Sequence, residues 1–369
     1  MSSHPERSDA APLSRVAVLT RFATIGVIVG AVLAAFAWAA GWFTPARLTP
    51  AKLVDTFEQV NGAHPGFRRN HAKGVCIAGA FDSNGAGASV SKASVFGAGR
   101  VAVSGRFALA GGQPYAADAA RSVRSMALRF RLADGEEWRT GMNDIPVFAV
   151  KTPQEFEQQL AASRPDPATG KPDPAAMKSF LDAHPQSARA IATIKAHAVS
   201  SGFGDDTYNS LDAFRFVDAA GKTSAVRWAM VPLQTSVTET TEQAAQTDKN
   251  YLFDALIADV ARKPLQWHLI VTLAQPGDAT DDATVAWPAD RTQIDVGTLT
   301  IDRVESEDSG ACRDLNFDPL VLPAGIEASD DPLLGARSAV YAQSVRRRAG
   351  EKKDASAVTA TASGSGSVR

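Results

Sequence analysis

The stretch Arg68-Arg69-Asn70-His71-Ala72-Lys73-Gly74 leads directly into an apolar run from Val75 to Phe81. A polar segment followed by such a run predicts a β-strand that begins near Gly74. His71 therefore stands at the entrance of a strand, just after two arginines. A single histidine in this place fits an acid or base beside an anionic group, and it equally fits an ordinary structural residue. Other parts of the chain have to decide between the two.

Downstream of this stretch, hydrophobic alternation predicts a series of antiparallel strands. Met126, Leu128, Phe130 and Leu132 alternate with small or charged residues, and a hairpin turn, Ala133-Asp134-Gly135, follows. The other predicted strands are Val101 to Leu109, Glu136 to Thr140, Leu211 to Val217, Ala225 to Val231, Trp267 to Leu273 and Gly297 to Val304. About eight strands with helices inserted between them predict an α+β fold, an antiparallel eight-stranded β-barrel with flanking helices.

Helical spacing and capping residues predict the helices around this barrel. Thr152-Pro153-Gln154-Glu155 combines an N-cap, a proline at the first helical position and a glutamate at the third. Further helices are expected within residues 44–65 and from Asp173, Gln186, Tyr251 and Ser329 onward. Ser329 is the predicted N-cap of the last helix, which Gly350 ends. Residues 350–369 follow as a predicted disordered tail, because Glu351 to Arg369 contain no aromatic side chain.

The N-terminal segment has the composition of a membrane span. No residue from Phe22 to Phe43 is charged, and this run is long enough for a helix to cross a bilayer. Arginines precede it and tryptophans lie near its far end, so residues 1–21 are expected in the cytoplasm and the domain of residues 44–349 outside it. The run fits an uncleaved anchor, a secretory signal cut after Ala37-Trp38-Ala39, or a buried core helix. The anchor is favoured because the run is longer than a usual signal core.

Composition narrows the class of protein further. The 369 residues are 45% apolar, enough for a large core, and their formal net charge of −2 gives no overall basic field for nucleic acid. Cys76 and Cys312 are too few for a disulfide framework or a metal knuckle. They are able to pair in an oxidising compartment, and the sequence leaves their redox state open.

Two more candidate sites lie downstream. Arg337 and Tyr341 are spaced i, i+4 on the last predicted helix, and Arg348 follows two turns later on the same face. A guanidinium beside a phenol favours the phenolate, the form that binds iron(III), although an ordinary basic helix shows the same pattern. Asn143, before Pro146, is able to hold a peroxide or water oxygen without titrating, or simply to form an Asx turn.

Taken in order, these segments resemble the haem catalases. The matching motifs are His71-Ala72-Lys73-Gly74, Gly105-Arg106-Phe107, Asn143-x-x-Pro146-Val147-Phe148, Asn316-Phe317-Asp318-Pro319, Gly325-Ile326-Glu327 and Gly335-x-Arg337-x-x-x-Tyr341. Each motif is moderately specific, but their order and spacing together are highly specific, across roughly residues 50–349. The resemblance favours the functional interpretation of each candidate site.

The resemblance implies a barrel around haem b. His71 would be the distal acid and base, Asn143 its partner at the peroxide oxygens, and Tyr341 the axial iron ligand. The remaining cofactor contacts would be Arg337 beside the phenolate, Phe156 beside the haem, and Arg68, Arg106 and Arg348 at its propionates.

Two positions depart from the family's pattern. Ala108 stands where most catalases have a serine that orients the distal histidine, so His71 is expected to be held less rigidly. Ala149 replaces a channel phenylalanine, which predicts a wider approach. The sequence also lacks the long N-terminal arm and C-terminal helical domain of full-length catalases. In this it resembles the compact bacterial catalase-related peroxidases, and a shorter wrap predicts a more open haem channel.

The predicted function is a haem-dependent peroxidase that reduces organic hydroperoxides and acts weakly as a catalase on hydrogen peroxide. An allene oxide synthase-like hydroperoxide isomerase and a non-catalytic, membrane-tethered barrel that binds haem or lipid are the alternatives. The expected partners are a small peroxide, an electron-donor co-substrate and the membrane, with no nucleic acid and with homo-oligomerisation left open. The expected location is a bacterial inner membrane with the catalytic domain in the periplasm, or the periplasm itself if the segment is cleaved.

Overall fold

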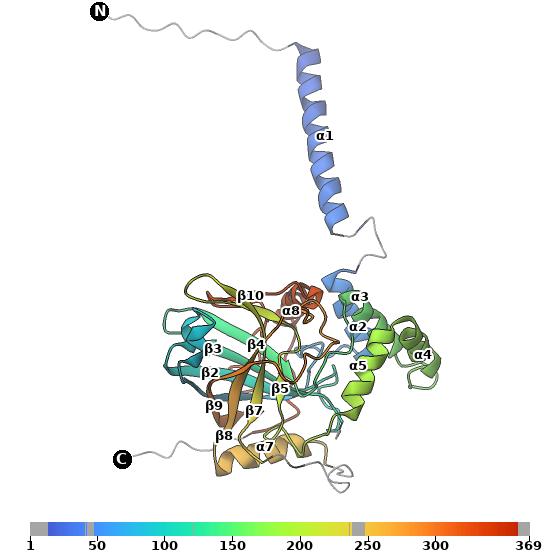
Figure 1. Ribbon diagram of the computed structural model, residues 1–369. Coiled ribbons are helices and arrows are strands. Elements are labelled where there is room, and N and C mark those ends of the chain that lie inside the picture. The colour runs from blue at the N-terminus through green and yellow to red at the C-terminus, as the bar shows by residue number, and fades with distance from the viewer. Residues whose placement is uncertain are drawn as a thin grey trace, which may run out of the picture. The chain divides into compact units, whose positions relative to one another are not determined.

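The computed structural model describes residues 14–40, 42, 48–119, 121–235, 237 and 248–360. The chain divides into two compact units, with the boundary between Thr49 and Pro50. The first unit contains one helix, α1 (Arg15–Ala39), and the second contains the other described elements (Figure 1).

Helix α1 begins earlier than the predicted apolar run and ends earlier, at Ala39. The Ser14 hydroxyl caps it by accepting a hydrogen bond from the Ala17 amide at 3.3 Å. Of the most apolar 18 residues of α1, only 6% are buried. The interpretation as a buried core helix is therefore wrong, because a core helix buries its apolar side chains. By length and composition α1 is able to cross a membrane, and a signal sequence would meet the same criteria.

The second unit is built on an antiparallel sheet that closes on itself. The barrel strands follow one another in the order β7-β5-β4-β3-β2-β1-β9-β8, and β8 pairs back onto β7. This arrangement confirms the predicted eight-stranded barrel, and β6 and β10 extend the sheet beside β7. The strands are β1 (Gly74–Ser83), β2 (Gly99–Leu109), β3 (Arg124–Arg131), β4 (Glu137–Asn143), β5 (Tyr208–Asn209), β6 (Phe214–Val217), β7 (Thr223–Pro232), β8 (Leu265–Leu273), β9 (Gln293–Glu305) and β10 (Ile326–Ala328).

Strand alternation places an aromatic core inside the barrel. Met126 and Phe130 of β3 are completely buried, as the period-two pattern predicts. Phe130 stacks on Trp138, its direct cross-strand partner on β4, with ring centroids 4.7 Å apart. Trp138 in turn meets Trp228 of β7 edge-on at 5.1 Å. Burial of such rings contributes roughly 25 cal/mol per Å² of apolar surface, so this cluster stabilises the scaffold that carries the site.

The helices gather mainly on one side of the barrel. Figure 1 shows α2, α3, α4 and α5 together there, and α7 at the lower end of the sheet. Thr152 caps α3 by accepting a hydrogen bond from the Glu155 amide at 3.2 Å, as predicted. The helices are α2 (Pro50–Asn61), α3 (Pro153–Ala162), α4 (Pro174–Ala183), α5 (Pro185–Ala196), α7 (Tyr251–Arg262) and α8 (Pro332–Ala349), with short 3-10 turns η1 (Ala86–Ser89) and η2 (Ser94–Phe96).

The cap of α8 differs from the prediction. Asp331, not Ser329, is the N-cap, since its carboxylate accepts a hydrogen bond from the Leu333 amide at 2.9 Å. The Ser329 hydroxyl instead accepts from the Asp331 amide at 3.1 Å and so holds the capping residue. Both side chains suit a cap, and only the position of the first helical turn decides between them.

The residues after α8 also differ from the prediction. Residues 351–360 are ordered against the domain, and Val358 is completely buried in the main core. The Ser306 hydroxyl donates to the Val358 carbonyl at 3.1 Å, and the Glu351 carboxylate accepts from the Gly66 amide at 2.8 Å. The disordered-tail prediction is therefore wrong for residues 351–360, because tertiary contacts hold a segment whose composition alone predicts disorder. Residues 361–369 lie outside the described residues.

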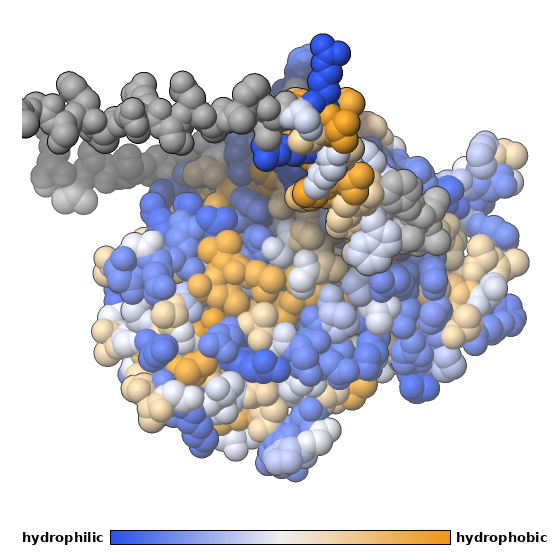
Figure 2. Space-filling view, turned by 90° about the horizontal axis from the view of Figure 1, so that it is seen from above, coloured by the Kyte–Doolittle hydropathy of each residue, from blue (hydrophilic) through white to orange (hydrophobic). Residues whose placement is uncertain are grey.

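One face of the second unit is largely polar (Figure 2). Figure 2 shows that the face seen from above is mostly hydrophilic, with an apolar area bordered by hydrophilic side chains. On α1, by contrast, large apolar side chains such as Phe22, Val27 and Phe36 are more than two-thirds exposed (69%, 72% and 70%). Such exposure is typical of a segment that meets lipid or another apolar partner.

Candidate active site

One end of the barrel and helix α8 enclose a cavity of about 190 Å³. Every site residue predicted from the sequence lines this cavity: Arg68, His71, Arg106, Asn143, Phe156, Arg337, Tyr341 and Arg348. The fold thus brings together side chains from the loop before β1, from β2 and β4, and from α3 and α8. Their chemical roles follow from the geometry of each wall.

The backbone of His71 has an unusual conformation. Its φ is +54°, in the left-handed region that non-glycine residues rarely adopt. The Asn70 side-chain oxygen accepts hydrogen bonds from the His71 amide at 3.0 Å and from the Gly111 amide at 2.8 Å, which holds this turn in place. Leu211, which also lines the cavity, has a φ of +65°. Strained backbone of this kind concentrates at functional sites, where the surrounding structure maintains it.

The imidazole of His71 is held by a serine. Its Nδ1 lies 2.9 Å from the Ser125 hydroxyl oxygen. Burial, together with the positive charges of Arg106 and Arg337, lowers the pKa of His71 to about 3. The ring is therefore neutral at pH 7 and able to accept a proton.

Ser125 also holds Asn143. The two residues are direct cross-strand partners on β3 and β4, and the Ser125 hydroxyl donates to Asn143 Oδ1 at 2.5 Å. Ser125 is likewise paired with Ala108 on β2. The looser hold on His71 that was expected from Ala108 is therefore not required, since the neighbouring strand β3 provides a hydroxyl.

The opposite wall of the cavity carries Tyr341 and Arg337. Arg337 forms an ion pair with the buried carboxylate of Asp212. Burial opposes the charge of Arg337, but Asp212 and a hydrogen bond to Tyr341 outweigh it and raise the pKa of Arg337. A Cβ atom on Gly141 would lie 3.7 Å from the Tyr341 hydroxyl oxygen, so glycine keeps β4 clear of this oxygen. The phenol oxygen thus faces the cavity beside a permanent positive charge.

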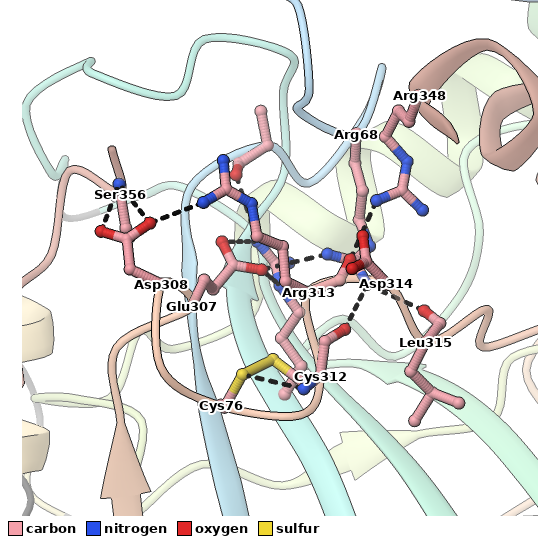
Figure 3. Close-up of polar contacts among 12 residues, drawn as sticks. Arg68, Cys76, Glu307, Asp308, Cys312, Arg313, Asp314, Leu315, Arg348 and Ser356 are labelled. Carbon is pink, nitrogen blue, oxygen red and sulfur yellow. Dashed lines mark hydrogen bonds and ion pairs between the residues drawn. A yellow bond between two sulfur atoms is a disulfide. The ribbon is translucent and has the colours of Figure 1, made fainter. Parts of the chain in front are cut away.

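A cluster of arginines forms the third side of the site. Arg68 forms an ion pair with Glu307 at 3.0 Å, and Arg106 contacts the same carboxylate at 2.8 Å. Arg348 donates to the Arg313 carbonyl at 2.9 Å. All these partners belong to residues 307–315, here called the collar. Figure 3 shows the guanidinium groups of Arg68 and Arg348 pointing toward the collar.

The collar is tied covalently to the barrel. Cys76 on β1 and Cys312 in the collar form a disulfide, which decides the redox state that the sequence leaves open (Figure 3). Two collar carbonyls, those of Cys312 and Leu315, each accept a hydrogen bond from Arg68 at 2.9 Å. The disulfide therefore anchors the segment that positions the arginine cluster.

Positive charge exceeds negative charge in this cluster. Arg68 and Arg106 share one carboxylate, that of Glu307, and burial with repulsion from Arg106 lowers the pKa of Arg68 to about 9. Among the described residues, Arg348 Nε is buried without a hydrogen-bond partner. Buried guanidinium groups in excess are a site for carboxylates or other anions.

Four residues of this site are not among those predicted from the sequence. The side of the cavity that carries His71 and Asn143 is here called the histidine wall. The four residues are Asn70 and Ser125, which contact His71, Asp212, which pairs with Arg337, and Glu307, which pairs with Arg106. Ser125 has a sequence signal of a kind, because it directly precedes the predicted strand from Met126 to Leu132, which follows the predicted strand from Val101 to Leu109. That signal is recognised only when the pairing of the two strands is known. Asn70, Asp212 and Glu307 lie in none of the matching motifs.

An antiparallel barrel whose cavity is lined by a neutral histidine, a tyrosine–arginine pair and an arginine cluster has a site that suits an anionic, largely apolar cofactor. The sequence profile of the catalase family, described as Catalase, matches residues 37–362. The chain therefore belongs to the catalase family.

Known relatives place the chain within this family. It is 35% identical to a catalase-related peroxidase of Synechococcus elongatus, over 89% of this chain and 96% of that one. It is 32% identical to a catalase-related peroxidase of Mycolicibacterium paratuberculosis, over 84% and 98% of the two chains. A fungal catalase structure superposes with a TM-score of 0.71 at 20% identity, covering 78% of this chain and 60% of that chain, which supports the fold. The chain is accordingly a haem enzyme of the peroxidase and catalase type.

The residues of the cavity fit a haem. The arginine cluster, with the unpartnered Nε of Arg348, suits its carboxylates, and the Tyr341 oxygen suits its iron. Apolar side chains between them, such as Phe57 and Phe156, suit a flat macrocycle, and their rings meet edge-on at 5.7 Å.

Proposed function

We propose that this protein is a peroxidase that binds haem b and reduces organic hydroperoxides, with weaker disproportionation of hydrogen peroxide. One observation carries the proposal. A neutral histidine and a carboxamide, both bonded to Ser125, line the same cavity as a tyrosine paired with a partly buried arginine. The catalase-related peroxidases to which the chain is similar over most of their length support this class of activity.

Each predicted residue receives a role in this proposal. Tyr341 would bind the iron, and Arg337 would stabilise its phenolate by charge and hydrogen bonding. Arg68, Arg106 and Arg348 would bind the two propionates, and Phe156 would contact the macrocycle. When bound, the haem supplies the redox chemistry that cleaves the peroxide bond.

Proton transfer takes place at the histidine wall. His71 accepts a proton from one peroxide oxygen and delivers it to the departing oxygen, which leaves as an alcohol or as water. Asn143 holds the oxygens by hydrogen bonding and does not change its own charge. Since His71 is buried and neutral, it is ready to act as a base before the substrate arrives.

The preference for larger hydroperoxides has structural support. Ala149, where the family has a channel phenylalanine, packs like Phe148 and Phe156 against a small apolar cluster, and of these three residues the two phenylalanines line the cavity. In this proposal the small side chain of Ala149 widens the approach past the two rings for an organic group on the peroxide. Apolar residues dominate the cavity wall, which suits such a group better than hydrogen peroxide.

The cellular placement is part of the proposal. Helix α1 would anchor the chain in a bacterial inner membrane, with the enzyme in the periplasm, or would direct export as a cleaved signal. The Cys76–Cys312 disulfide supports an oxidising compartment, because structural disulfides persist there. Residues 1–21 would then be a cytoplasmic tail and residues 44–349 the core of the haem domain.

Turnover with two peroxides tests the proposed activity. The haem-loaded protein is expected to reduce cumene hydroperoxide while taking two electrons per peroxide from an aromatic donor, with kcat/KM above that for oxygen release from hydrogen peroxide. Donor oxidation is followed by absorbance and oxygen by an electrode. Rapid oxygen release with no reaction of cumene hydroperoxide would contradict the proposal. Conversion of a lipid hydroperoxide without donor consumption would indicate an isomerase instead.

Removal of the disulfide tests the role of the collar. Cys76→Ser/Cys312→Ser is expected to lower the free energy of unfolding by about 2–5 kcal/mol, because the bond closes a long loop in the unfolded chain. Haem loss should also accelerate, since the collar no longer holds the arginines firmly. Urea unfolding and haem transfer to excess apomyoglobin measure the two effects.

The chemical reductant provides the matched control for this variant. Dithiothreitol should make the wild-type protein behave like the double variant and leave the variant itself unchanged. Equal haem-transfer rates in reduced and oxidised wild-type protein would show that the collar holds the arginines without the disulfide.

A further inference from the structure

We propose that the Ser125 hydroxyl is the single positioning group for both catalytic side chains: it selects the tautomer of His71 and the amide orientation of Asn143. The inference rests on the proposed roles of His71 and Asn143. It assigns to β3 a task that the family pattern places at the position of Ala108 on β2.

The location of Ser125 makes one hydroxyl sufficient for two partners. Ser125 lies on β3, paired with Ala108 of β2 on one side and with Asn143 of β4 on the other. It is 8% exposed, and both Ala108 and Ser125 line the cavity. Its oxygen lies 2.9 Å from His71 Nδ1 and 2.5 Å from Asn143 Oδ1. Because β3 lies between β2 and β4, its Ser125 side chain is able to reach both His71 and Asn143.

Counting protons gives the donor-to-acceptor direction of the hydrogen-bond chain that joins His71, Ser125 and Asn143. The serine hydroxyl has one proton, and an amide oxygen only accepts, so Ser125 donates to Asn143 Oδ1. The second contact of the hydroxyl oxygen must then be a donor, which makes His71 Nδ1 the protonated ring nitrogen. A neutral imidazole has one N–H group, so Nε2 keeps its lone pair.

The same chain orients the two groups that a hydroperoxide needs. With Oδ1 turned to Ser125, the NH₂ group of Asn143 remains for the substrate oxygen. With Nδ1 turned to Ser125, Nε2 of His71 remains to accept the substrate proton. One acceptor and one donor are therefore available together, which is the pairing for an O–O–H group.

The reversed chain is the alternative arrangement. In it the Asn143 NH₂ group would donate to Ser125, Ser125 would donate to His71 Nδ1, and Nε2 would carry the proton. The 2.5 Å separation argues against this direction, because it suits an O–H···O bond and is short for N–H···O. In the reversed chain His71 would also lack a base for the first proton transfer.

Removal of the hydroxyl is the primary test. Ser125→Ala in the haem-loaded enzyme is expected to lower kcat for cumene hydroperoxide about tenfold to a hundredfold, with KM and haem content near wild type. The loss stays partial because Asn70 still holds the His71 turn through its hydrogen bonds from the His71 and Gly111 amides. Ser104→Ala, which removes a β2 hydroxyl bonded to Arg129 outside the cavity, is the matched control and should be unchanged.

Cyanide binding provides a readout without turnover. Hydrogen cyanide binds ferric haem as the anion and must leave its proton on a nearby base, here His71 Nε2. Ser125→Ala is therefore expected to weaken cyanide affinity, measured from the haem absorption, in the same direction as His71→Ala. A purely structural role of Ser125 would change thermal unfolding and leave this affinity unchanged.

A swapped hydroxyl separates the two halves of the inference. Ala108→Ser/Ser125→Ala places the hydroxyl beside His71 but one strand further from Asn143. It should recover cyanide affinity and only part of kcat. Adding Asn143→Ala to Ser125→Ala should cost less than Asn143→Ala costs in the wild type, because both changes break the same chain.

The outcomes distinguish this inference from the proposed function. Wild-type kcat and cyanide affinity in Ser125→Ala, with turnover lost in His71→Ala, would overturn the inference and leave the function standing. Full turnover in His71→Ala would overturn the function itself. If Ser125→Ala folds poorly, Ser125→Cys carries the test, since a thiol has nearly the same shape and is a weak hydrogen-bonding group. Unchanged kcat in Ser125→Cys would then overturn the inference.

Discussion

His71→Ala is expected to lower kcat/KM for a hydroperoxide about a hundredfold to ten-thousandfold, while the protein keeps its haem. The side chain supplies the base that takes the first proton and the acid that returns it, and no water can replace both at a fixed position. Its pKa of about 3 means that the wild-type ring is a neutral base throughout the physiological range. Stopped-flow absorbance measures the reaction with peroxide, and the haem-to-protein ratio is determined on the same samples.

The control for this variant is a histidine outside the cavity. His268 on β8 has a side chain that is 40% exposed and lies 2.9 Å from Asp295. His268→Ala should keep wild-type kcat/KM and haem content. Equal peroxide turnover in His71→Ala and the wild type would exclude His71 as the acid and base.

Tyr341→Phe is expected to weaken haem binding by much more than tenfold, so that most of the purified protein lacks the cofactor. Phenylalanine preserves the ring that packs in α8 and removes the oxygen proposed to bind iron. The change also leaves Arg337 without its hydrogen bond to the Tyr341 oxygen, although Asp212 still pairs with it. Haem content after reconstitution and the absorption spectrum of any bound haem measure the effect.

Tyr115 offers a matched loss of a phenol oxygen. It is half exposed, its hydroxyl donates to the Ala355 carbonyl at 2.8 Å, and it lies outside the cavity. Tyr115→Phe should bind haem like the wild type. A Tyr341→Phe protein with full haem content and an unchanged spectrum would show that another residue is the iron ligand.

The two walls of the site depend on different kinds of support. The tyrosine wall is carried by one helix, whose spacing alone puts Arg337, Tyr341 and Arg348 on a single face. The histidine wall is assembled from a loop and two neighbouring strands, through Asn70, Ser125 and Asn143. Small changes in strand register would therefore disturb the histidine wall first.

This difference explains what could be predicted. Residues on one helix face, or inside a motif, are visible in a linear sequence, so all the predicted site residues are found in one cavity. Ser125 was missed because a motif compares positions along the chain, whereas its hydroxyl acts across strands. Ala108 and Ser125 lie on two strands separated by a loop, and they are cross-strand partners on β2 and β3.

The collar was missed for a related reason. Glu307 is buried between two arginines, and nothing in its neighbourhood in sequence marks it as a partner of Arg68 or Arg106. Cys76 and Cys312 are separated by 236 residues, so only the closed barrel and the collar together bring their sulfur atoms into bonding distance. The packing of Val358 follows the same logic, because its burial depends on a core made elsewhere in the chain.

By itself, the sequence determined the antiparallel barrel, most of the helices, and the side chains that line the cavity. Alternation, capping and spacing are local, and local patterns are sufficient for these features. The tertiary structure alone decided which hydroxyl holds His71, which carboxylates face the arginines, and that the two cysteines are joined. These are contacts between strands and loops remote in sequence, and their energies depend on distance in space, which only the folded barrel sets.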